Sequence, residues 1–118
     1  MRVYVYQEAC DMRCSFERLT ALAKNQVGED PMSGHLFLFL NRTRTSIKIL
    51  YFDRTGYCIW YKRLESGTFS RPQESEITYR TLACVLEGIE EQNIVKKKRY
   101  LLREHAGSVV PEVEKYGT

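Results

Sequence analysis

The sequence lacks the features that mark membrane and secreted proteins. Its longest unbroken apolar run extends only from Leu36 to Leu40, whereas a membrane-spanning helix needs about 20 apolar residues. The first residues contain no long apolar stretch followed by a small-residue cleavage site, so no secretion signal is expected. By default we expect a cytoplasmic protein without membrane contact, in which the 4 cysteines are reduced thiols rather than a disulfide framework.

Motifs for metal binding and catalysis are missing as well. No two cysteines have the Cys-x-x-Cys spacing of a zinc site, and Cys58 and Cys84 stand alone in apolar surroundings. Neither of the 2 histidines lies in a catalytic sequence, and no glycine-rich phosphate-binding loop is present. The strand-like segments contain no carboxylates that could converge on metal ions. We therefore expect no metal, no cofactor and no enzymatic activity, and a cryptic nuclease is the weakest function considered.

Length and composition favour one folded unit. The chain has 118 residues, of which 43% are hydrophobic and 28% are charged, so it is too apolar for a disordered protein and leaves little room for a second domain. We expect residues 1–95 to form a single α+β domain and residues 96–118 to form a basic, partly ordered C-terminal tail.

The first part of the chain predicts a strand followed by a helix. Residues 2–6 alternate valine and tyrosine, which favour strands. Asp11 is placed where its carboxylate can cap a helix, which would leave Arg13 free for a phosphate or a partner carboxylate. Apolar residues then recur at spacings of three and four until Gly28 ends the helix. The predicted buried face comprises Met12, Phe16, Leu19, Leu22, Ala23 and Val27.

Three strand-like segments follow, at residues 35–40, 46–52 and 56–64. The first is apolar at every position but one, as in a central strand covered on both faces. Connections this short require antiparallel neighbours, so the three segments predict a meander. In the second connection Gly56 is expected to take the positive φ that a tight hairpin needs.

The remaining elements complete the predicted fold. Residues 67–69 are expected to add a short edge strand, and Thr78 to cap a helix over residues 79–92. Its apolar face would pack on the sheet, while Glu87, Glu90 and Glu91 would face solvent. The fold class is therefore α+β: an antiparallel β-meander with an N-terminal β-α unit and a C-terminal packing helix.

Charge is distributed unevenly along the chain. The formal net charge is only +3, yet residues 42–63 carry +5 and residues 96–118 carry +3. Between them residues 64–95 carry −4, and the first 41 residues carry −1. Two basic segments separated by an acidic one permit binding to a polyanion.

Two parts of the chain are candidates for nucleic-acid binding. One sheet face could present lysine and arginine beside aromatic rings, and such a surface holds phosphates and stacks on bases; the alternative is a solvated face whose aromatics turn into the core. The basic tail could track phosphates, or it could only keep the chain soluble. The candidate residues are Arg13, Arg42, Arg44, Lys48, Trp60, Lys62, Arg63, Lys96, Lys97, Lys98 and Arg99.

Several motifs in the same order resemble one protein family. These are Asp11-Met12-Arg13, the DPMSGHLF segment at residues 30–37, Lys62-Arg63-Leu64-Glu65 and Leu86-Glu87-Gly88-Ile89. Together they are similar to the TnpB-type, Orf2-like accessory proteins of insertion sequences of the IS-sixty-six family. The family usually has lysine where this chain has Cys14, and many members have Trp-Pro where this chain has Arg71-Pro72.

The resemblance implies a protein that is encoded beside a separate transposase and supports transposition. It carries over no catalytic residues, because the biochemical activity of the family is poorly defined. Our leading hypothesis is a non-enzymatic transposition accessory protein that binds DNA through the basic sheet face and the C-terminal arm. The alternative hypothesis is a protein-interaction module that docks on the transposase, through the acidic helix or a sheet edge, without contacting DNA.

Overall fold

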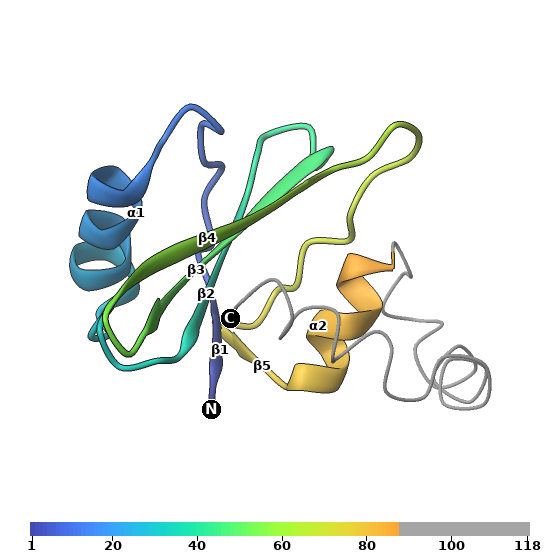
Figure 1. Ribbon diagram of the computed structural model, residues 1–118. Coiled ribbons are helices and arrows are strands. Elements are labelled where there is room, and N and C mark those ends of the chain that lie inside the picture. Colours follow the sequence, from blue (N-terminus) through green and yellow to red (C-terminus); the bar gives the residue numbers. More distant parts are fainter. Residues whose placement is uncertain (88–118) are drawn as a thin grey trace.

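A computed structural model describes residues 1–87, which form a five-stranded sheet with helices on both faces (Figure 1). The sheet order is β4-β3-β2-β1-β5. Helical segment α1 covers one face and α2 the other, as Figure 1 shows. In chain order the elements are β1 (Val3–Val5), α1 (Phe16–Leu22), the π-helical segment η1 (Ala23–Val27), β2 (Leu36–Leu40), β3 (Ser46–Asp53), β4 (Gly56–Arg63), β5 (Glu76–Ile77) and α2 (Tyr79–Leu86).

The centre of the sheet is β2, in which all five residues are buried. This confirms the prediction of a strand covered on both faces. On one side β1 pairs with it in parallel, with Tyr4 beside Phe37, and α1 with η1 makes the crossover that a parallel pair requires. The short strand β5 pairs antiparallel with β1. The sheet is therefore mixed, and the chain is an α+β protein as predicted.

The antiparallel meander of β2, β3 and β4 is also confirmed. Leu38 is paired with Ile49, and Ile49 with Trp60, so the register is continuous across the three strands. In the β3–β4 turn, however, positive φ occurs at Arg54 (47°) and not at Gly56. The Gly56 prediction was wrong because this glycine is already paired with Asp53 as the first residue of β4.

The start of the first helix differs from the prediction. α1 begins at Phe16 after Ser15, whose side chain makes no capping hydrogen bond. Asp11 is not the cap: its Oδ1 accepts the Arg13 backbone N–H at 2.8 Å, and its carbonyl accepts the Cys14 N–H at 3.0 Å. Asp side chains commonly form this local turn in competition with a helix.

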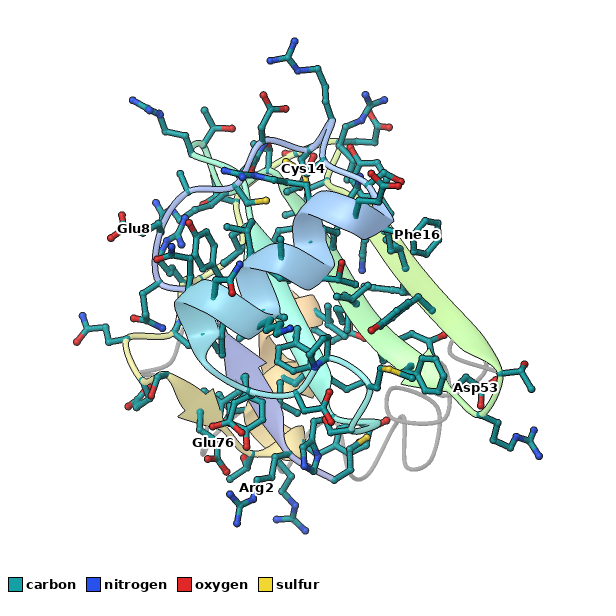
Figure 2. All side chains as sticks on the ribbon, turned by 90° about the vertical axis from the view of Figure 1, so that its left-hand side faces the viewer. Arg2, Glu8, Cys14, Phe16, Asp53 and Glu76 are labelled. Atoms are coloured by element: carbon teal, nitrogen blue, oxygen red, sulfur yellow. The ribbon has the colours of Figure 1, made fainter. Side chains whose placement is uncertain are left out.

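The buried face of α1 is shorter than predicted. Leu19, Leu22 and Ala23 are buried, but the Phe16 side chain is 43% exposed and points away from the sheet core in Figure 2. As predicted, the helical segment ends at Gly28, which adopts φ 83° and donates its N–H to the Ala23 carbonyl. A left-handed C-terminal glycine of this kind is a common helix stop.

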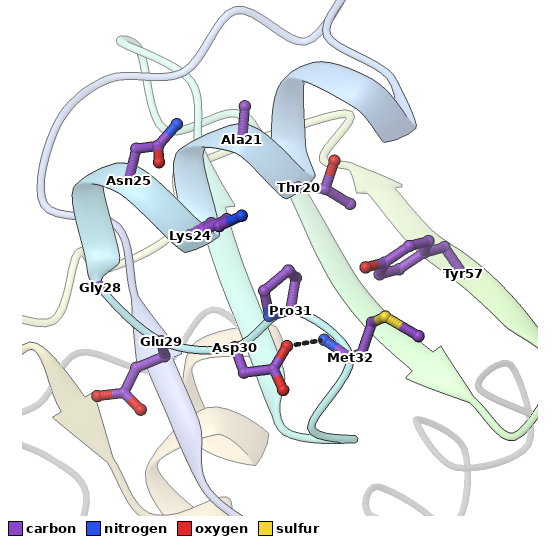
Figure 3. Close-up of a pocket in the computed structure, with 10 residues that line it drawn as sticks. All are labelled: Thr20, Ala21, Lys24, Asn25, Gly28, Glu29, Asp30, Pro31, Met32 and Tyr57. Carbon is purple, nitrogen blue, oxygen red and sulfur yellow. Dashed lines mark hydrogen bonds between the residues drawn. The ribbon is translucent and has the colours of Figure 1, made fainter.

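The loop from Gly28 to β2 crosses the end of α1 beside the β3–β4 hairpin. Asp30 Oδ1 accepts the Met32 backbone N–H at 2.9 Å, and Pro31 is buried (Figure 3). Together with η1 and Tyr57 of β4, this loop lines an open pocket of about 650 Å³.

The connection between β4 and α2 differs from the prediction. Residues 67–69 form no strand. Instead Phe69 is completely buried, and its N–H donates to the Arg44 carbonyl at 2.7 Å. The segment is held by one buried ring and not by a ladder of hydrogen bonds.

The second helix begins as predicted, since the Thr78 hydroxyl accepts the Thr81 N–H. Its predicted apolar residues Leu82, Val85 and Leu86 are buried, and Glu87 is exposed. Glu90, Glu91 and the predicted end of this helix lie outside the described residues. Neither helix in residues 1–87 has the length and apolarity that a membrane crossing requires.

Side chains alternate between two hydrophobic cores. Tyr4, Phe37, Phe39 and Leu50 pack under α1, whereas Val5, Leu38, Ile47 and Ile49 pack under α2 together with Phe69. Because strand side chains alternate with period two, the register of β3 and β4 decides which core each residue enters.

Two phenylalanines provide a matched test of this arrangement. Substituting Phe69 with alanine removes a fully buried ring and should lower the free energy of unfolding by about 3–5 kcal/mol. Phe16→Ala removes a ring that is 43% exposed and should cost less than about 1 kcal/mol. Urea denaturation of both variants measures the difference. Equal losses would contradict the exposed position of Phe16.

Candidate nucleic-acid interface

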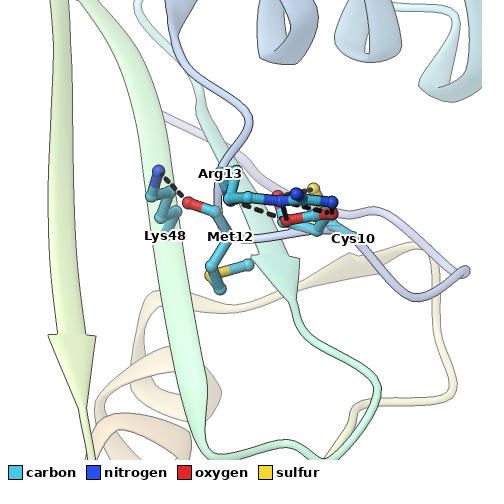
Figure 4. A network of polar contacts seen from close by, with 5 residues as sticks. Cys10, Met12, Arg13 and Lys48 are labelled. Carbon is cyan, nitrogen blue, oxygen red and sulfur yellow. Dashed lines mark hydrogen bonds and ion pairs between the residues drawn. The ribbon is translucent and has the colours of Figure 1, made fainter.

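Lys48, the central cation of the predicted basic face, is buried. Only 9% of the residue is exposed. Its Nζ donates to the carbonyl oxygens of Met12 and Cys14, both at 2.7 Å, and lies 5.2 Å from the centre of the Tyr61 ring. Figure 4 shows the Lys48 side chain reaching the loop before α1. A buried ammonium needs such partners, so Lys48 joins this loop to the sheet instead of presenting a charge to solvent.

Lys62 lies on the opposite face of the sheet. Lys48 is paired with Tyr61, whereas Lys62 is paired with Ile47, whose side chain enters the core under α2. The Lys62 Nζ donates to the Leu86 carbonyl at 3.0 Å, at the C-terminal end of α2, where the helix dipole favours a positive charge. The prediction that Lys48, Lys62 and Arg63 form one basic stripe was therefore wrong.

The predicted aromatic partner is also on the other face. Trp60 is half-buried and packs against the core under α2. On the α1 face the exposed ring beside Lys48 is Tyr61, at 50% exposure. Knowledge of the two-residue β3–β4 turn would have revealed this from the sequence, because such a turn fixes which residues are opposite each other.

Arg13 has a carboxylate partner and is not free as predicted. Its guanidinium donates to both Asp11 carboxylate oxygens, the shortest contact being Nη2 to Oδ2 at 2.7 Å (Figure 4). Hydrogen bonds from the Arg13 side chain and backbone lower the pKa of Asp11 to about 2. The pair is solvent-exposed, so a ligand phosphate at Arg13 would compete with the Asp11 carboxylate.

The β2–β3 turn presents two further arginines on a well-ordered backbone. Asn41 Oδ1 accepts the N–H groups of Thr45 and Ser46, at 2.9 and 3.0 Å. Arg44 adopts φ 59°, donates its N–H to the Asn41 carbonyl and accepts the Phe69 N–H. These two backbone hydrogen bonds stabilise the left-handed conformation of Arg44. The Arg42 and Arg44 side chains therefore project from an ordered turn.

Arg63 lies at the same end of the sheet, because it is paired with Ser46 at the start of β3. Arg42, Arg44 and Arg63 are exposed, and within residues 1–87 their side chains have no hydrogen-bond or ion-pair partner. We call these three residues the arginine cluster. The pattern of the sequence did place all three among the candidates.

Arg71, which the sequence did not single out, supports this end of the sheet. Its guanidinium donates to the Asn41 carbonyl at 3.3 Å and to the Glu8 carbonyl at 3.2 Å. Arg71 therefore braces the turn that carries the arginine cluster. The sequence could not predict this contact, because Glu8 and Asn41 lie 63 and 30 residues away from Arg71 along the chain.

Two paired acidic side chains lie at the other end of the sheet. Figure 2 shows Asp53 and Glu76 there, far from Cys14 and Phe16. At that end Asp53 pairs with Arg54, and Glu76 with Arg2. Acidic residues also lie toward the arginine cluster: Arg71 binds both the Glu8 and the Asn41 carbonyl, Glu65 lies two residues after Arg63, and Glu87 follows Leu86, whose carbonyl binds Lys62.

Other chemistry is sparse in the described region. Residues 1–87 contain no group of three or more His, Cys, Asp or Glu side chains that could hold a metal ion. Burial, together with the neighbouring Cys14 thiol, raises the pKa of Cys10 to about 12, so Cys10 is a neutral thiol near neutral pH. The basic residues Lys96, Lys97, Lys98 and Arg99 lie outside the described residues.

Comparisons with known proteins identify one family. A family model described as IS66 Orf2 like protein matches residues 1–96. The uncharacterized protein y4hO of Sinorhizobium fredii is 31% identical over 94 residues, which cover 76% of this chain and 82% of y4hO. The uncharacterized protein y4jC of the same organism is 31% identical over 72 residues, which cover 61% of this chain and 62% of y4jC. No solved structure matches.

Lys48→Met tests the structural role of the buried cation. The substitution keeps the apolar stem but leaves the Met12 and Cys14 carbonyls without their donor, which should lower the free energy of unfolding by about 2–3 kcal/mol. Lys24→Met, at an exposed position, should change it by less than about 0.5 kcal/mol. A Lys48→Met protein as stable as the parent in urea would refute the assignment.

The Asp11–Arg13 pair predicts a pH effect. A carboxyl whose folded pKa lies near 2, below its ordinary value of about 3.8, stabilises the fold above pH 4, and this contribution is lost as the pH falls from 4 to 2. Carboxyl NMR titration should place the Asp11 pKa at about 2, and Arg13→Gln should raise it. An Asp11 pKa unchanged by Arg13→Gln would show that the ion pair does not form in solution.

Proposed function

The chain belongs to the IS66 Orf2-like family, and we propose that it serves transposition of its element as a non-enzymatic accessory protein that binds DNA phosphates. The observation that carries the proposal is the arginine cluster: Arg42, Arg44 and Arg63 are exposed at one end of the sheet and lack partners within the described chain. Guanidinium groups suit phosphate because their planar donors can bind two oxygens at once.

The contacts are made to the DNA backbone. The turn of residues 41–45 is too short to place a helix or a two-stranded ribbon in the major groove, where base sequence is read. Phosphate contacts position a protein without carrying sequence information. The protein therefore binds element ends and unrelated duplexes with similar affinity, and the choice of site falls to the transposase.

The basic tail supplies further cations for DNA binding. Lys96, Lys97, Lys98 and Arg99 are consecutive cations, and each additional phosphate contact adds to affinity by releasing condensed counterions. The sheet contributes fewer cations to DNA binding than the sequence suggested, because Lys48 and Lys62 are bound to backbone carbonyls.

A second candidate function is docking on the transposase without DNA contact. It is favoured by the free outer edge of β4, the last strand of the sheet, since exposed edges accept additional strands. Co-purification with the transposase that survives nuclease treatment, together with absence of DNA binding at low salt, would support this function over the first.

Replacing the arginine cluster provides the test of DNA binding. In fluorescence-anisotropy titrations at two salt concentrations, the Arg42→Ala/Arg44→Ala/Arg63→Ala protein should bind duplex DNA more weakly than the parent. The slope of log affinity against log salt should fall by about 2–3, because each lost phosphate contact removes about 0.9. Neutralising Lys96, Lys97, Lys98 and Arg99 should lower it further.

Arg54→Ala is the matched control, since Arg54 is an exposed arginine in the turn at the opposite end of the sheet. It should leave affinity and salt slope unchanged. Absence of DNA binding by the parent protein at low salt would contradict the proposal. If Arg54→Ala weakened DNA binding as much as the loss of the arginine cluster, only net charge would matter.

A further inference from the structure

The outer edge of β4 is unpaired. β4 is the last strand in the sheet order, and all eight of its residues are matched with β3 on its inner side. The Leu64 N–H donates to the Thr45 carbonyl at 2.8 Å, so even-numbered residues of this strand direct their backbone groups toward β3. Backbone groups alternate along an antiparallel ladder. Tyr57, Ile59, Tyr61 and Arg63 therefore direct their N–H and C=O groups outward.

Within residues 1–87 this edge has few of the usual protections, and its exposed charge is Arg63 at the end of the strand. Sheet edges are usually blunted by proline, a bulge, a very short strand or a covering element. β4 contains no proline, its register with β3 has no bulge, and it is as long as β3. Lys62 does not protect the edge either, because its Nζ is bound to the Leu86 carbonyl.

A pocket of about 650 Å³ lies beside the same edge on the α1 face, with Tyr57 of β4 in its lining. The outward-directed residues of β4 carry their side chains on this face, where Tyr57 and Ile59 pack against the core under α1. Phe16, Tyr61 and Met32 are exposed apolar side chains, at 43%, 50% and 57% exposure respectively. Ala21, Pro31 and Met32 also line the pocket (Figure 3).

We propose that an extended, acidic segment of a partner protein binds the free edge of β4 as a sixth strand and places apolar side chains in the pocket beside α1. Strand addition of this kind derives affinity from backbone hydrogen bonds and specificity from pockets for alternate side chains. A partner residue opposite Tyr57 shares its face of the sheet, so its side chain is directed toward the pocket.

The net charge around β4 favours an acidic partner strand. The β3–β4 hairpin with the turn before it, residues 42–63, carries +5 and only one acid, Asp53, which is paired with Arg54. An acidic strand complements this hairpin. A second copy of the chain would place two hairpins of +5 against each other, which like-charge repulsion opposes.

This inference stands apart from DNA binding. It uses the backbone of β4 and the pocket beside α1, whereas DNA binding uses the side chains of the arginine cluster. A substitution at Tyr61 leaves all three arginines in place, so the failure of one proposal is distinguishable from the failure of the other.

The test begins with the full chain and a phage-displayed library of random peptides of about ten residues, the upper length of ordinary strands. Enriched peptides should alternate acidic and apolar residues. In NMR hydrogen exchange, a synthetic peptide from the selection should slow exchange of the Tyr57, Ile59, Tyr61 and Arg63 amides. No enrichment, enrichment of basic peptides, or protection outside β4 would overturn the proposal.

Tyr61→Pro removes one outward N–H, and Tyr61→Ala removes the ring while keeping that N–H. Proline is tolerated at an edge position whose N–H faces solvent, and circular dichroism checks the fold of both. Peptide affinity should fall about tenfold more for Tyr61→Pro than for Tyr61→Ala, while DNA affinity stays equal in the two. Equal peptide affinities would contradict strand addition, and a dimer in sedimentation that Tyr61→Pro converts to monomer would assign the edge to a second copy.

Discussion

The arrangement of this protein depends on the burial of one positive charge. The Lys48 ammonium lies inside the molecule and is held by two carbonyls of the loop before α1. Burying an ammonium is costly unless its donors are satisfied, so the loop must return to the sheet at this point. That return positions the start of α1 and the Asp11–Arg13 pair. The Asp11-Met12-Arg13 segment thus lies beside the buried cation, which binds the Met12 carbonyl.

Much of the fold follows from the sequence because local patterns were strong. The apolar run of β2 indicated a central strand, Gly28 a helix stop and Thr78 a helix cap, and all three are confirmed. The local patterns failed to predict features that depend on residues far apart in the sequence. Asp11 prefers a local turn to a helix cap, and the parallel pairing of β1 with β2 depends on how the crossover packs, which no single segment encodes.

The candidate site was predictable as a set of residues but not as a surface. Lys48 and Lys62 lie in adjacent strands, and only the register places them on opposite faces, where each binds backbone carbonyls. Arg42, Arg44 and Arg63 lie at the same end of the sheet because the end of β4 is paired with the start of β3, next to the β2–β3 turn. In the basic segment of residues 42–63, Lys48 and Lys62 bind backbone carbonyls, whereas Arg42, Arg44 and Arg63 are exposed.

This division of charge is the central claim, and Lys62→Gln compared with Arg44→Gln tests it most directly, since each removes one positive charge from the same segment. The free energy of unfolding and the affinity for duplex DNA are measured for both variants. We expect Lys62→Gln to lower stability and leave DNA affinity unchanged, because its ammonium binds the end of α2. Arg44→Gln should weaken DNA binding with little loss of stability. The reverse pattern, with DNA affinity lost in Lys62→Gln and retained in Arg44→Gln, would contradict the account.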